Sequence, residues 1–557
     1  MNENNIILSG YENTELLGCY QTDKLPKTYC YDDLPNYSLD GVLKSNRYID
    51  GKLMQTYTGH GSHVGVIAAT RLGKTTSYVI PTVLSFAKQK TKKSMLITDP
   101  KGEIYRYTAA TLKEQGYTVK LINFRDYRRS ECWNPMTHIF RIYQRAQNIY
   151  SEVGLIMVDG RPRNTFRGKV YEDQAELTNE IENERNLLLN EAENEIDIFS
   201  RMIIDTVSTR DPTWEDGARD FFRAHIYAML EDTQLKDNPI TEDTFSLNTI
   251  FRVVDTFRNT SSGYEDGGYF SSRSKDSKAY NLAKNIILDT ASATRSSYIS
   301  VFVTKLTEYR EVTTRMITSC NSFELEKLIC SGPVAIFIDF HDELDSQYDT
   351  ITLFVQDVYK TLVEVARRSE NGKLDAPWYF ILDEFGNFTR LKNFDKTISA
   401  CAGRNIYFII IIQSYAQLDN VYGAETAKII RDNLNVHVFF GSNNPGTIDE
   451  FSRECGEYTR ISPLSAINGK GADIEHYEIE TIPRVTKSWL RKLAPGECIV
   501  TEANCGYVLF SRLERYYNCA EFNNLPLSRE SDYIPTVNPL DSRYNYTYEP
   551  NNKDFDW

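Results

Sequence analysis

Short apolar runs recur along this chain, and the first of them alternate with stretches of helical character. The runs extend over Val64 to Ala68, Met95 to Thr98 and Val119 to Asn123, with helical patterns from Thr75 to Lys88 and then onward to Gln115. A strand that is buried on both faces of a parallel sheet is apolar throughout. The alternation therefore predicts an α/β fold with a parallel-rich central sheet.

The pattern changes after Trp133, where amphipathic helical stretches and polar loops replace most strand-like runs. We interpret this part of the chain as an all-α insertion, because apolar residues recur there at helical spacing. Strand-like runs then resume. They cover Val334 to Asp339, Trp378 to Leu382, Ile406 to Ile412, Val436 to Phe440, Glu497 to Thr501 and Tyr507 to Leu513.

These changes of pattern predict the domain boundaries. Residues 1–50 are expected to form an irregular leader wrapped on the main domain. The sheet domain has its first part at 51–139 and its second part at 329–522, and the inserted all-α domain occupies 140–328. The polar tail at 523–557 is rich in Asn, Asp, Tyr and Pro, which is more typical of an extended or disordered segment.

One apolar run leads into a loop that is suited to phosphate. The predicted strand Val64 to Ala68 is followed by small and polar residues, a Gly-Lys-Thr sequence and a helical pattern. Backbone N–H groups of such a loop can curl around an anion, and the following helix directs its positive end toward that anion. The residues predicted to bind nucleotide are Thr70, Arg71, Leu72, Gly73, Lys74, Thr75 and Thr76.

Within this loop, Lys74 would reach the β- and γ-phosphates of ATP, and Thr75 would ligate Mg²⁺. The usual pattern begins with glycine where this chain has Ala68, so the site requires Ala68 to keep a negative φ. The alternative is a surface turn that happens to contain Gly-Lys-Thr. No further metal is expected, because the 10 cysteines form no Cys-x-x-Cys pair and show no metal-ligand spacing with the 7 histidines.

Two carboxylates follow the apolar run that ends at Leu382. Ligands of open α/β sheets bind at the carboxyl ends of strands, so Asp383 and Glu384 are expected beside the phosphate loop. Asp383 would hold Mg²⁺, and Glu384 would orient and deprotonate the water that attacks the γ-phosphate. Alone, the same sequence also fits a strand that ends in a solvated acidic turn. Asp99, near Lys101, could brace Mg²⁺ or a strand end, or form an ordinary salt bridge.

Gln413 and Arg404 flank the predicted strand Ile406 to Ile412. Gln413 could sense the γ-phosphate and pass the state of hydrolysis to a moving part, or it could be an ordinary polar strand end. Arg404 could reach the nucleotide of a neighbouring subunit as an arginine finger, or it could be a surface arginine at a helix end. The residues alone leave both alternatives open.

Composition limits the range of partners. A chain of 557 residues with 41% hydrophobic and 25% charged residues is typical of a folded protein with several domains. The net charge of -14 argues against indiscriminate coating of nucleic acid or anionic membrane, although a local basic channel remains compatible with it. We find neither a secretory signal, with basic residues followed by an apolar core, nor an apolar stretch that could span a bilayer. The chain is therefore expected to be cytoplasmic and to reach membranes through a partner.

Taken together, these residues resemble the coupling ATPases of conjugative type IV secretion systems, the RecA-like motors that bring DNA and protein substrates to a transfer channel. The resemblance covers most of the chain from about Gly51 to Tyr517. It rests on Thr70 to Thr75, Asp99 to Glu103, Trp133 to Pro135, Trp214 to Arg219, Leu382 to Gly386, Gly403-Arg404, Gln413-Ser414 and Leu493 to Glu497.

The resemblance implies a RecA-like P-loop ATPase domain whose inserted all-α domain is linked to substrate recognition. It assigns the arginine finger to Arg404 and the state-sensing glutamine to Gln413. It also implies a homo-hexamer in which the nucleotide lies between subunits, with Lys74 and Glu384 on one side and Arg404 on the other. The expected partners are a relaxase joined to single-stranded DNA.

Members of this family usually begin with transmembrane helices, so a separate membrane-anchored subunit of the secretion channel is also expected. It would hold this chain at the inner face of the cell membrane. Two alternatives to a conjugative motor remain. The first is a non-hydrolysing docking platform of a secretion channel, which Ala68 keeps open, and the second is a translocase of double-stranded DNA or protein outside conjugation.

Overall fold

A computed structural model describes residues 6–7, 15–17, 27–159, 161–205, 212–258, 269–344, 347–464, 476–503, 505 and 508–547. The described residues form two compact units. The first is drawn from 1–125 and 324–534, and the second from 126–323 and 535–557. The sequence predicts the insertion at 140–328, so the second unit begins earlier than expected and also takes up the end of the chain.

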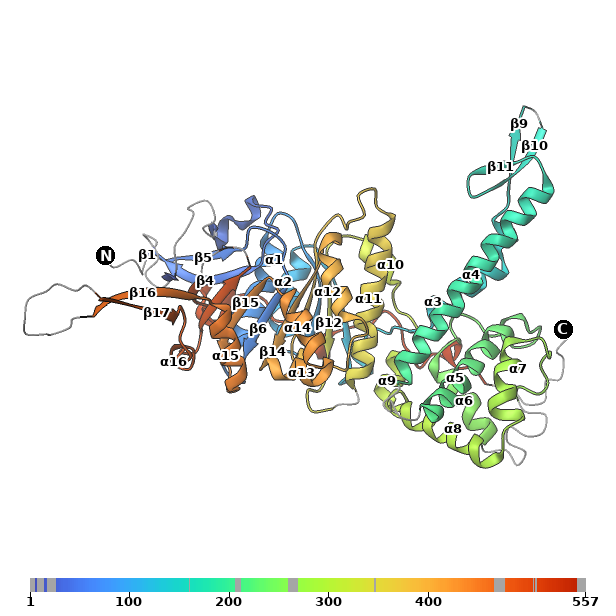
Figure 1. The fold of residues 1–557 in the computed structure, drawn as a ribbon. Coiled ribbons are helices and arrows are strands. Elements are labelled where there is room, and N and C mark those ends of the chain that lie inside the picture. Colours follow the sequence, from blue (N-terminus) through green and yellow to red (C-terminus); the bar gives the residue numbers. More distant parts are fainter. Residues whose placement is uncertain are drawn as a thin grey trace, which may run out of the picture. The chain divides into compact units, whose positions relative to one another are not determined.

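An 11-stranded sheet forms the centre of the first unit (Figure 1). Every neighbouring pair from β15 to β8 is parallel, whereas the pairs from β15 outward to β1 are antiparallel. This confirms the predicted α/β fold with a parallel-rich sheet. In spatial order the strands are β1 (Ile6–Ile7), β2 (Glu15–Leu17), β19 (Val508–Arg512), β18 (Glu497–Glu502), β15 (Val436–Gly441), β6 (Val64–Ala68), β14 (Ile406–Ile412), β13 (Trp378–Leu382), β7 (Ser94–Asp99), β12 (Val334–Asp339) and β8 (Thr118–Asn123).

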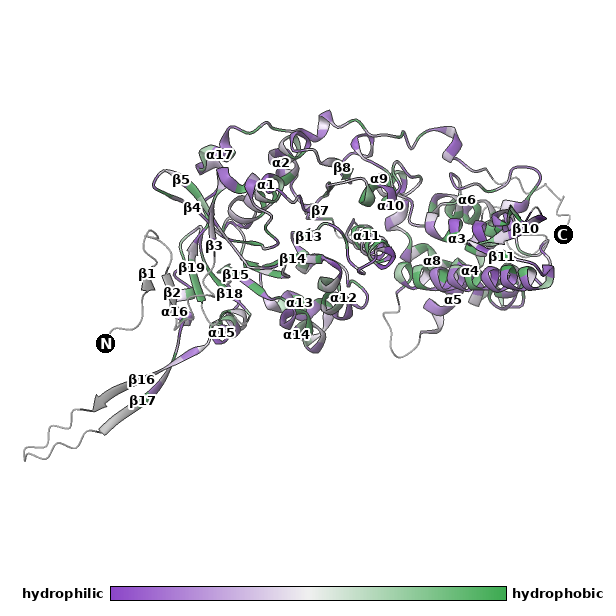
Figure 2. Cartoon of the chain, turned by 90° about the horizontal axis from the view of Figure 1, so that it is seen from above, coloured by the Kyte–Doolittle hydropathy of each residue, from purple (hydrophilic) through white to green (hydrophobic). Residues whose placement is uncertain are grey.

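Helices cover both faces of this sheet. Figure 2 shows α1 (Ile80–Lys88) and α2 (Glu103–Glu114) on one side of the strands, and α11 (Tyr348–Arg368), α12 (Phe394–Cys401) and α13 (Tyr415–Tyr422) on the other. Every residue of β6, β12, β13 and β14 is buried. The uninterrupted apolar runs of the sequence are therefore the expected consequence of a sheet with two covered faces.

Part of the predicted irregular leader is ordered as a small sheet of β3 (Lys27–Cys30), β5 (Lys52–Tyr57) and β4 (Leu43–Ile49). Strand β4 is polar in sequence, yet it is mostly buried, and two of its polar side chains have polar partners. Lys44 forms a buried ion pair with Glu502 of β18, and Ser45 Oγ donates to Thr56 Oγ1 over 3.0 Å. Polar groups that have hydrogen-bond partners can be buried. They interrupt the alternation of apolar and polar residues by which a strand is recognised in sequence.

The sequence predicts an all-α insertion. The second unit is mainly helical, but it also contains a sheet. A three-stranded sheet is formed by β9 (Gly154–Val158), β10 (Arg161–Phe166) and β11 (Lys169–Tyr171). The dipeptide Asp159-Gly160 is a hairpin signal in the sequence that the helical interpretation passed over. At the second turn, Arg167 and Gly168 both take a positive φ, of 51° and 81°. The helices are α3 (Thr137–Gln147), α4 (Gln174–Ile203), α5 (Thr213–Glu231), α6 (Leu247–Arg258), α7 (Lys278–Ala283), α8 (Ser292–Lys305) and α9 (Val312–Ile317).

The described part of the C-terminal tail is packed rather than disordered. Tyr533 is buried in the first unit, and Tyr544 and Tyr546 are buried in the second. Among the described residues, no helix is both long and apolar enough to cross a membrane. The remaining elements are α10 (Leu325–Cys330), α14 (Ala424–Asp432), α15 (Pro445–Glu454), β16 (Glu457–Leu464), β17 (His476–Pro483), α16 (Lys487–Leu490) and α17 (Ala520–Asn523).

The ion pair between Lys44 and Glu502 gives a test of how the small sheet is fixed to the central one. Lys44→Met should lower the free energy of unfolding by about 3 kcal/mol, because it removes the ammonium from beside a buried carboxylate. The double variant Lys44→Met/Glu502→Met should recover most of this loss, since it removes both charges. Urea unfolding followed by tryptophan fluorescence measures both. A double variant as unstable as the single one would contradict the assignment.

Candidate nucleotide-binding site

The loop after β6 has the backbone geometry of a phosphate cradle. Ala69 N–H donates to Gly441 O over 2.9 Å, which fixes the start of the loop to the end of β15. The chain then turns through positive φ at Arg71 (69°) and Gly73 (93°). Such a turn directs successive backbone N–H groups to one side. Ala68 keeps a negative φ within β6, so the condition that the sequence set for this position is met.

A π-helical turn over Lys74–Val79 follows the loop directly and continues into α1. π-Turns are rare and occur frequently at functional sites. Ser77 N–H donates to Gly73 O over 2.7 Å, so the turn holds the last residue of the loop. Pro81 lies in the first turn of α1, directly after the π-helical turn, and it has no N–H to donate to a carbonyl of that turn.

The carboxyl ends of β6 and β13 bring together two predicted groups that are far apart in sequence. Lys74 Nζ lies 3.0 Å from Asp383 Oδ1 and also contacts Glu384 Oε1. Thr75 Oγ1 donates to Asp383 Oδ2 over 3.2 Å. Gln413 Nε2, after β14, donates to Glu384 Oε2 over 3.2 Å. The structure therefore joins Lys74, Thr75, Asp383, Glu384 and Gln413 in one network.

The charges in this network stabilise one another. Burial lowers the pKa of the Lys74 ammonium, but the carboxylates of Asp383 and Glu384 more than offset burial, so the pKa is raised above its ordinary value. Lys74 is thus held in its charged form. The hydroxyl of Thr75 and the carboxylate of Asp383 are close enough to share a Mg²⁺ ion, which prefers oxygen ligands.

Glu384 has an unusual backbone conformation. Its φ of 54° and ψ of 35° lie in the left-handed region, which costs about 1–3 kcal/mol for a residue other than glycine. Asp383 Oδ1 accepts a hydrogen bond of 2.9 Å from the Glu384 N–H and so supports this turn. The turn directs the Glu384 carboxylate to Lys74 and Gln413, so the strain coincides with the proposed chemistry.

Gln417 contacts this network, although it is not among the residues that the sequence predicts for the site. Its Oε1 accepts a hydrogen bond of 2.8 Å from Gln413 N–H and thereby orients the residue that contacts Glu384. A Cβ atom at Gly386 would lie 2.5 Å from Gln417 Cδ, so glycine is needed there for Gln417 to approach. The spacing of four residues on α13 was visible in the sequence, but the contact with Gly386 was not.

Arg515 was also missed, and it lies beside the phosphate loop. Its Nε is 3.8 Å from the position that a Cβ of Gly73 would occupy. Arg515 Nη1 donates to the hydroxyl of Tyr517, and the guanidinium lies 5.8 Å from the centre of that ring. Next to it, the rings of Tyr516 and Tyr107 of α2 are 4.6 Å apart. A guanidinium held at this place would meet an anion in the loop.

Asp99 and Asp339 continue the row of carboxylates along β7 and β12. Burial raises the pKa of Asp99 to about 8, with the N–H of Tyr105 opposing and Asp339 adding to the shift. Burial likewise raises the pKa of Asp339 to about 6, although the neighbouring Arg125 lowers it. Asp99 accepts from Tyr105 N–H over 2.7 Å, and the structure gives it no ion pair with Lys101, although it describes both residues.

Arg404 is not part of this network within one chain. It precedes β14, whereas Gln413 follows it. The length of the strand, about 23 Å at 3.3 Å per residue, therefore separates Arg404 from the site. Its side chain is half-buried, and its Nη1 donates to Ala400 O over 3.2 Å. Only another copy of the chain could bring an Arg404 to this site.

The parallel strands of the sheet and the loop after β6 define a RecA-like α/β fold with a P-loop. The chain belongs to the family described as "Type IV secretory system Conjugative DNA transfer", whose model matches residues 31–471. It is similar to VirD4 of Rhizobium rhizogenes, with 26% identity over 72% of this chain and 50% of that protein. It is also similar to the conjugal transfer protein TraG of Escherichia coli, with 22% identity over 76% of this chain and 59% of that protein. The chain thus spans about half the length of the curated relatives it matches.

Solved structures show the same fold. The bacterial conjugative coupling protein TrwBdeltaN70 matches with a TM-score of 0.57 and 14% identity, over 88% of this chain and 93% of that one. TrwB in complex with a non-hydrolysable ATP analogue matches with a TM-score of 0.52 and 14% identity, over 81% of this chain and 85% of that one. A further match, with a TM-score of 0.51 and 14% identity over 81% of this chain and 85% of that one, is TrwB in complex with ADP and Mg²⁺.

The raised pKa of Asp99 predicts how stability depends on pH. Between about pH 4 and pH 8 the folded chain keeps a proton on Asp99 that the unfolded chain has released. The free energy of unfolding therefore falls as pH rises through this window, by at most about 1.4 kcal/mol per pH unit. Asp99→Asn should flatten this part of the curve, which urea unfolding at pH 5 and pH 8 measures. An unchanged slope in the variant would contradict the assignment.

Proposed function

We propose that this chain is an ATP-hydrolysing coupling protein of a conjugative type IV secretion system. It would recruit single-stranded DNA joined to a relaxase and drive its delivery to the transfer channel. The observation that carries the proposal is the network of Lys74, Asp383, Glu384 and Gln413 beside a phosphate loop. Family membership supplies the conjugative context.

The chain's own residues would divide the work of hydrolysis. Backbone N–H groups from Thr70 to Thr75 would bind the phosphates, and the charged Lys74 would leave its carboxylate partners for the β- and γ-phosphates. Glu384 would then be free to accept a proton from the attacking water. Thr75 and Asp383 would hold Mg²⁺, which supplies positive charge to the phosphate oxygens. Gln413, fixed by Gln417, would report to α13 whether Glu384 has changed its partner.

The proposal includes a homo-hexamer with the nucleotide between subunits. Arg404 of one subunit would complete the site of the next subunit. This arrangement would explain why Arg404 and the network lie at opposite ends of β14 within one chain. A membrane-anchored subunit of the channel would hold the assembly at the inner face of the cell membrane. The alternative of a docking platform has less support, because Ala68 keeps the backbone conformation that the loop requires.

Steady-state ATP hydrolysis with and without single-stranded DNA tests the proposal. Lys74→Ala should weaken nucleotide binding and abolish turnover, whereas Glu384→Gln should keep binding and lower turnover by at least about 100-fold. Arg404→Ala should keep binding and lose about 1,000-fold in turnover, while the exposed Arg367→Ala serves as its matched control. Assembled protein that binds ATP without turnover would favour the docking platform.

Arg515 offers a separate test of the nucleotide site. Arg515→Ala should weaken binding of a non-hydrolysable ATP analogue by about 10-fold or more, because it removes a charged hydrogen-bond donor beside Gly73. Arg515→Lys should recover part of the affinity. Arg512→Ala removes a nearby exposed arginine and should leave affinity unchanged. Fluorescence titration measures all three, and equal affinity of Arg515→Ala and wild type would exclude the role.

A further inference from the structure

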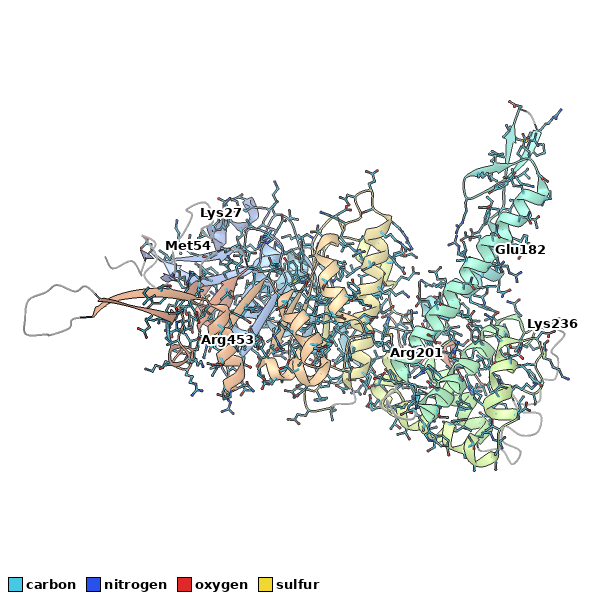
Figure 3. All side chains as sticks on the ribbon, in the orientation of Figure 1. Lys27, Met54, Glu182, Arg201, Lys236 and Arg453 are labelled. Atoms are coloured by element: carbon cyan, nitrogen blue, oxygen red, sulfur yellow. The ribbon has the colours of Figure 1, made fainter. Side chains whose placement is uncertain are left out.

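Strand β9 exposes apolar side chains along its whole length. Leu155 is 69% exposed, Met157 66%, Ile156 40% and Val158 36%. The strand belongs to the three-stranded sheet at the far end of α4 (Figure 1). Figure 3 shows side chains projecting from this sheet beyond the labelled Glu182 of α4. Neighbouring residues of a strand point to opposite faces, so both faces of β9 are apolar and in contact with solvent.

This sheet is firmly attached to the helix. Phe166 and Tyr171 are buried in one apolar cluster with Leu177 and Ile181 of α4. Ion pairs add to the attachment, since Arg167 Nη2 lies 2.6 Å from Glu184 Oε1 and Lys169 Nζ lies 2.9 Å from Glu176 Oε1. The exposed strand is therefore one edge of a supported platform. The apolar side chains of β9 are not part of the cluster that attaches the sheet to α4.

The outer edge of β9 carries backbone groups without a strand partner in the described sheet. The strand order is β11-β10-β9, so β9 pairs with β10 alone. Val158 and Arg161 close the hairpin, and hydrogen-bonded pairs alternate from there. Leu155 and Met157 consequently direct their N–H and C=O groups away from β10. Pro162 lies opposite Met157, at a position where its missing N–H removes no bond to β9.

The charge of the supporting helix indicates the kind of partner. Acidic residues greatly outnumber basic ones along α4, from Gln174 to Ile203. The sheet itself carries basic residues, but Arg163, Arg167 and Lys169 are paired with Glu172, Glu184 and Glu176. The remaining acidic residues of α4 therefore leave this region negative, and an anionic lipid surface would be repelled. An exposed apolar edge with free backbone groups is instead a template for another strand.

We propose that the β9 edge binds an extended, mainly apolar segment of a partner polypeptide as an added β-strand, and that basic residues flanking this segment favour its approach to α4. Backbone hydrogen bonds with Leu155 and Met157 would give the segment its register. Its side chains would cover the apolar residues on both faces of β9. This binding goes beyond nucleotide chemistry and requires no ATP.

The test uses the full chain without nucleotide and a synthetic peptide of alternating Val and Thr with lysines at both ends. The peptide should bind, and it should slow hydrogen exchange at the amides of Leu155 and Met157. A matched peptide with glutamates at both ends should bind several-fold more weakly. Absence of binding, or binding that leaves both amides unprotected, would overturn the proposal.

Variants separate the backbone contribution from that of the side chain. Leu155→Pro removes one outward N–H while leaving the bonds to β10, and it should weaken binding of the lysine peptide at least 10-fold. Leu155→Thr keeps that N–H and should weaken binding only a few-fold. Met157→Pro repeats the test at the second outward residue, and the exchange measurement on the wild type needs no variant. Equal affinity of both proline variants and the wild type would refute strand addition.

Two other occupants have distinct signatures. Co-sedimentation of the wild type with phosphatidylglycerol vesicles, lost in Leu155→Asp and accompanied by no peptide binding, would replace the proposal with a lipid contact. Concentration-dependent self-association of the free chain that Leu155→Pro abolishes would replace it with pairing between two copies. The proposal expects neither result.

Discussion

The contact of the Lys74 ammonium with the carboxylates of Asp383 and Glu384 is the interaction on which the functional account depends. It joins residues more than half the chain apart, and it can form only because β6 and β13 are parallel members of one sheet whose carboxyl ends meet at the same edge. One ammonium lies between two carboxylates there, so both carboxylates favour its charged form. The fold thus creates a site in which an arriving phosphate would exchange partners with groups that are already charged.

Hydrogen bonds within and beside the network hold its side chains in place. Glu384 keeps a left-handed backbone because Asp383 accepts its N–H. Gln413 keeps its orientation because Gln417 accepts its N–H, and Gln417 reaches it over the glycine at position 386. A change at Glu384 would therefore be transmitted to α13 through a short chain of hydrogen bonds. This is a physical route by which hydrolysis could move another part of the molecule.

The central sheet and most of the site could be predicted from sequence, because uninterrupted apolar runs mark strands with two covered faces and because ligands bind at the carboxyl ends of such strands. Strand β4 could not, since Lys44 and Ser45 are buried with polar partners and disrupt the pattern. The role of Arg515 depends on tertiary packing, which places a residue near the end of the chain beside Gly73. The sheet of β9, β10 and β11 was not predicted, because these short strands precede the long helix α4 and the segment was interpreted from the helical spacing of its apolar residues. Arg404 stays a prediction, because its function would arise only between subunits.

The most direct test of a shared, hydrolysing site is ATP turnover by a mixture of the Lys74→Ala and Arg404→Ala variants in the presence of single-stranded DNA. Each variant alone should be inactive. In a mixed assembly, the intact phosphate loop of an Arg404→Ala subunit can face the intact Arg404 of a Lys74→Ala subunit, so the mixture should regain part of the wild-type turnover. A mixture that assembles and binds nucleotide but stays as inactive as its components would contradict the account.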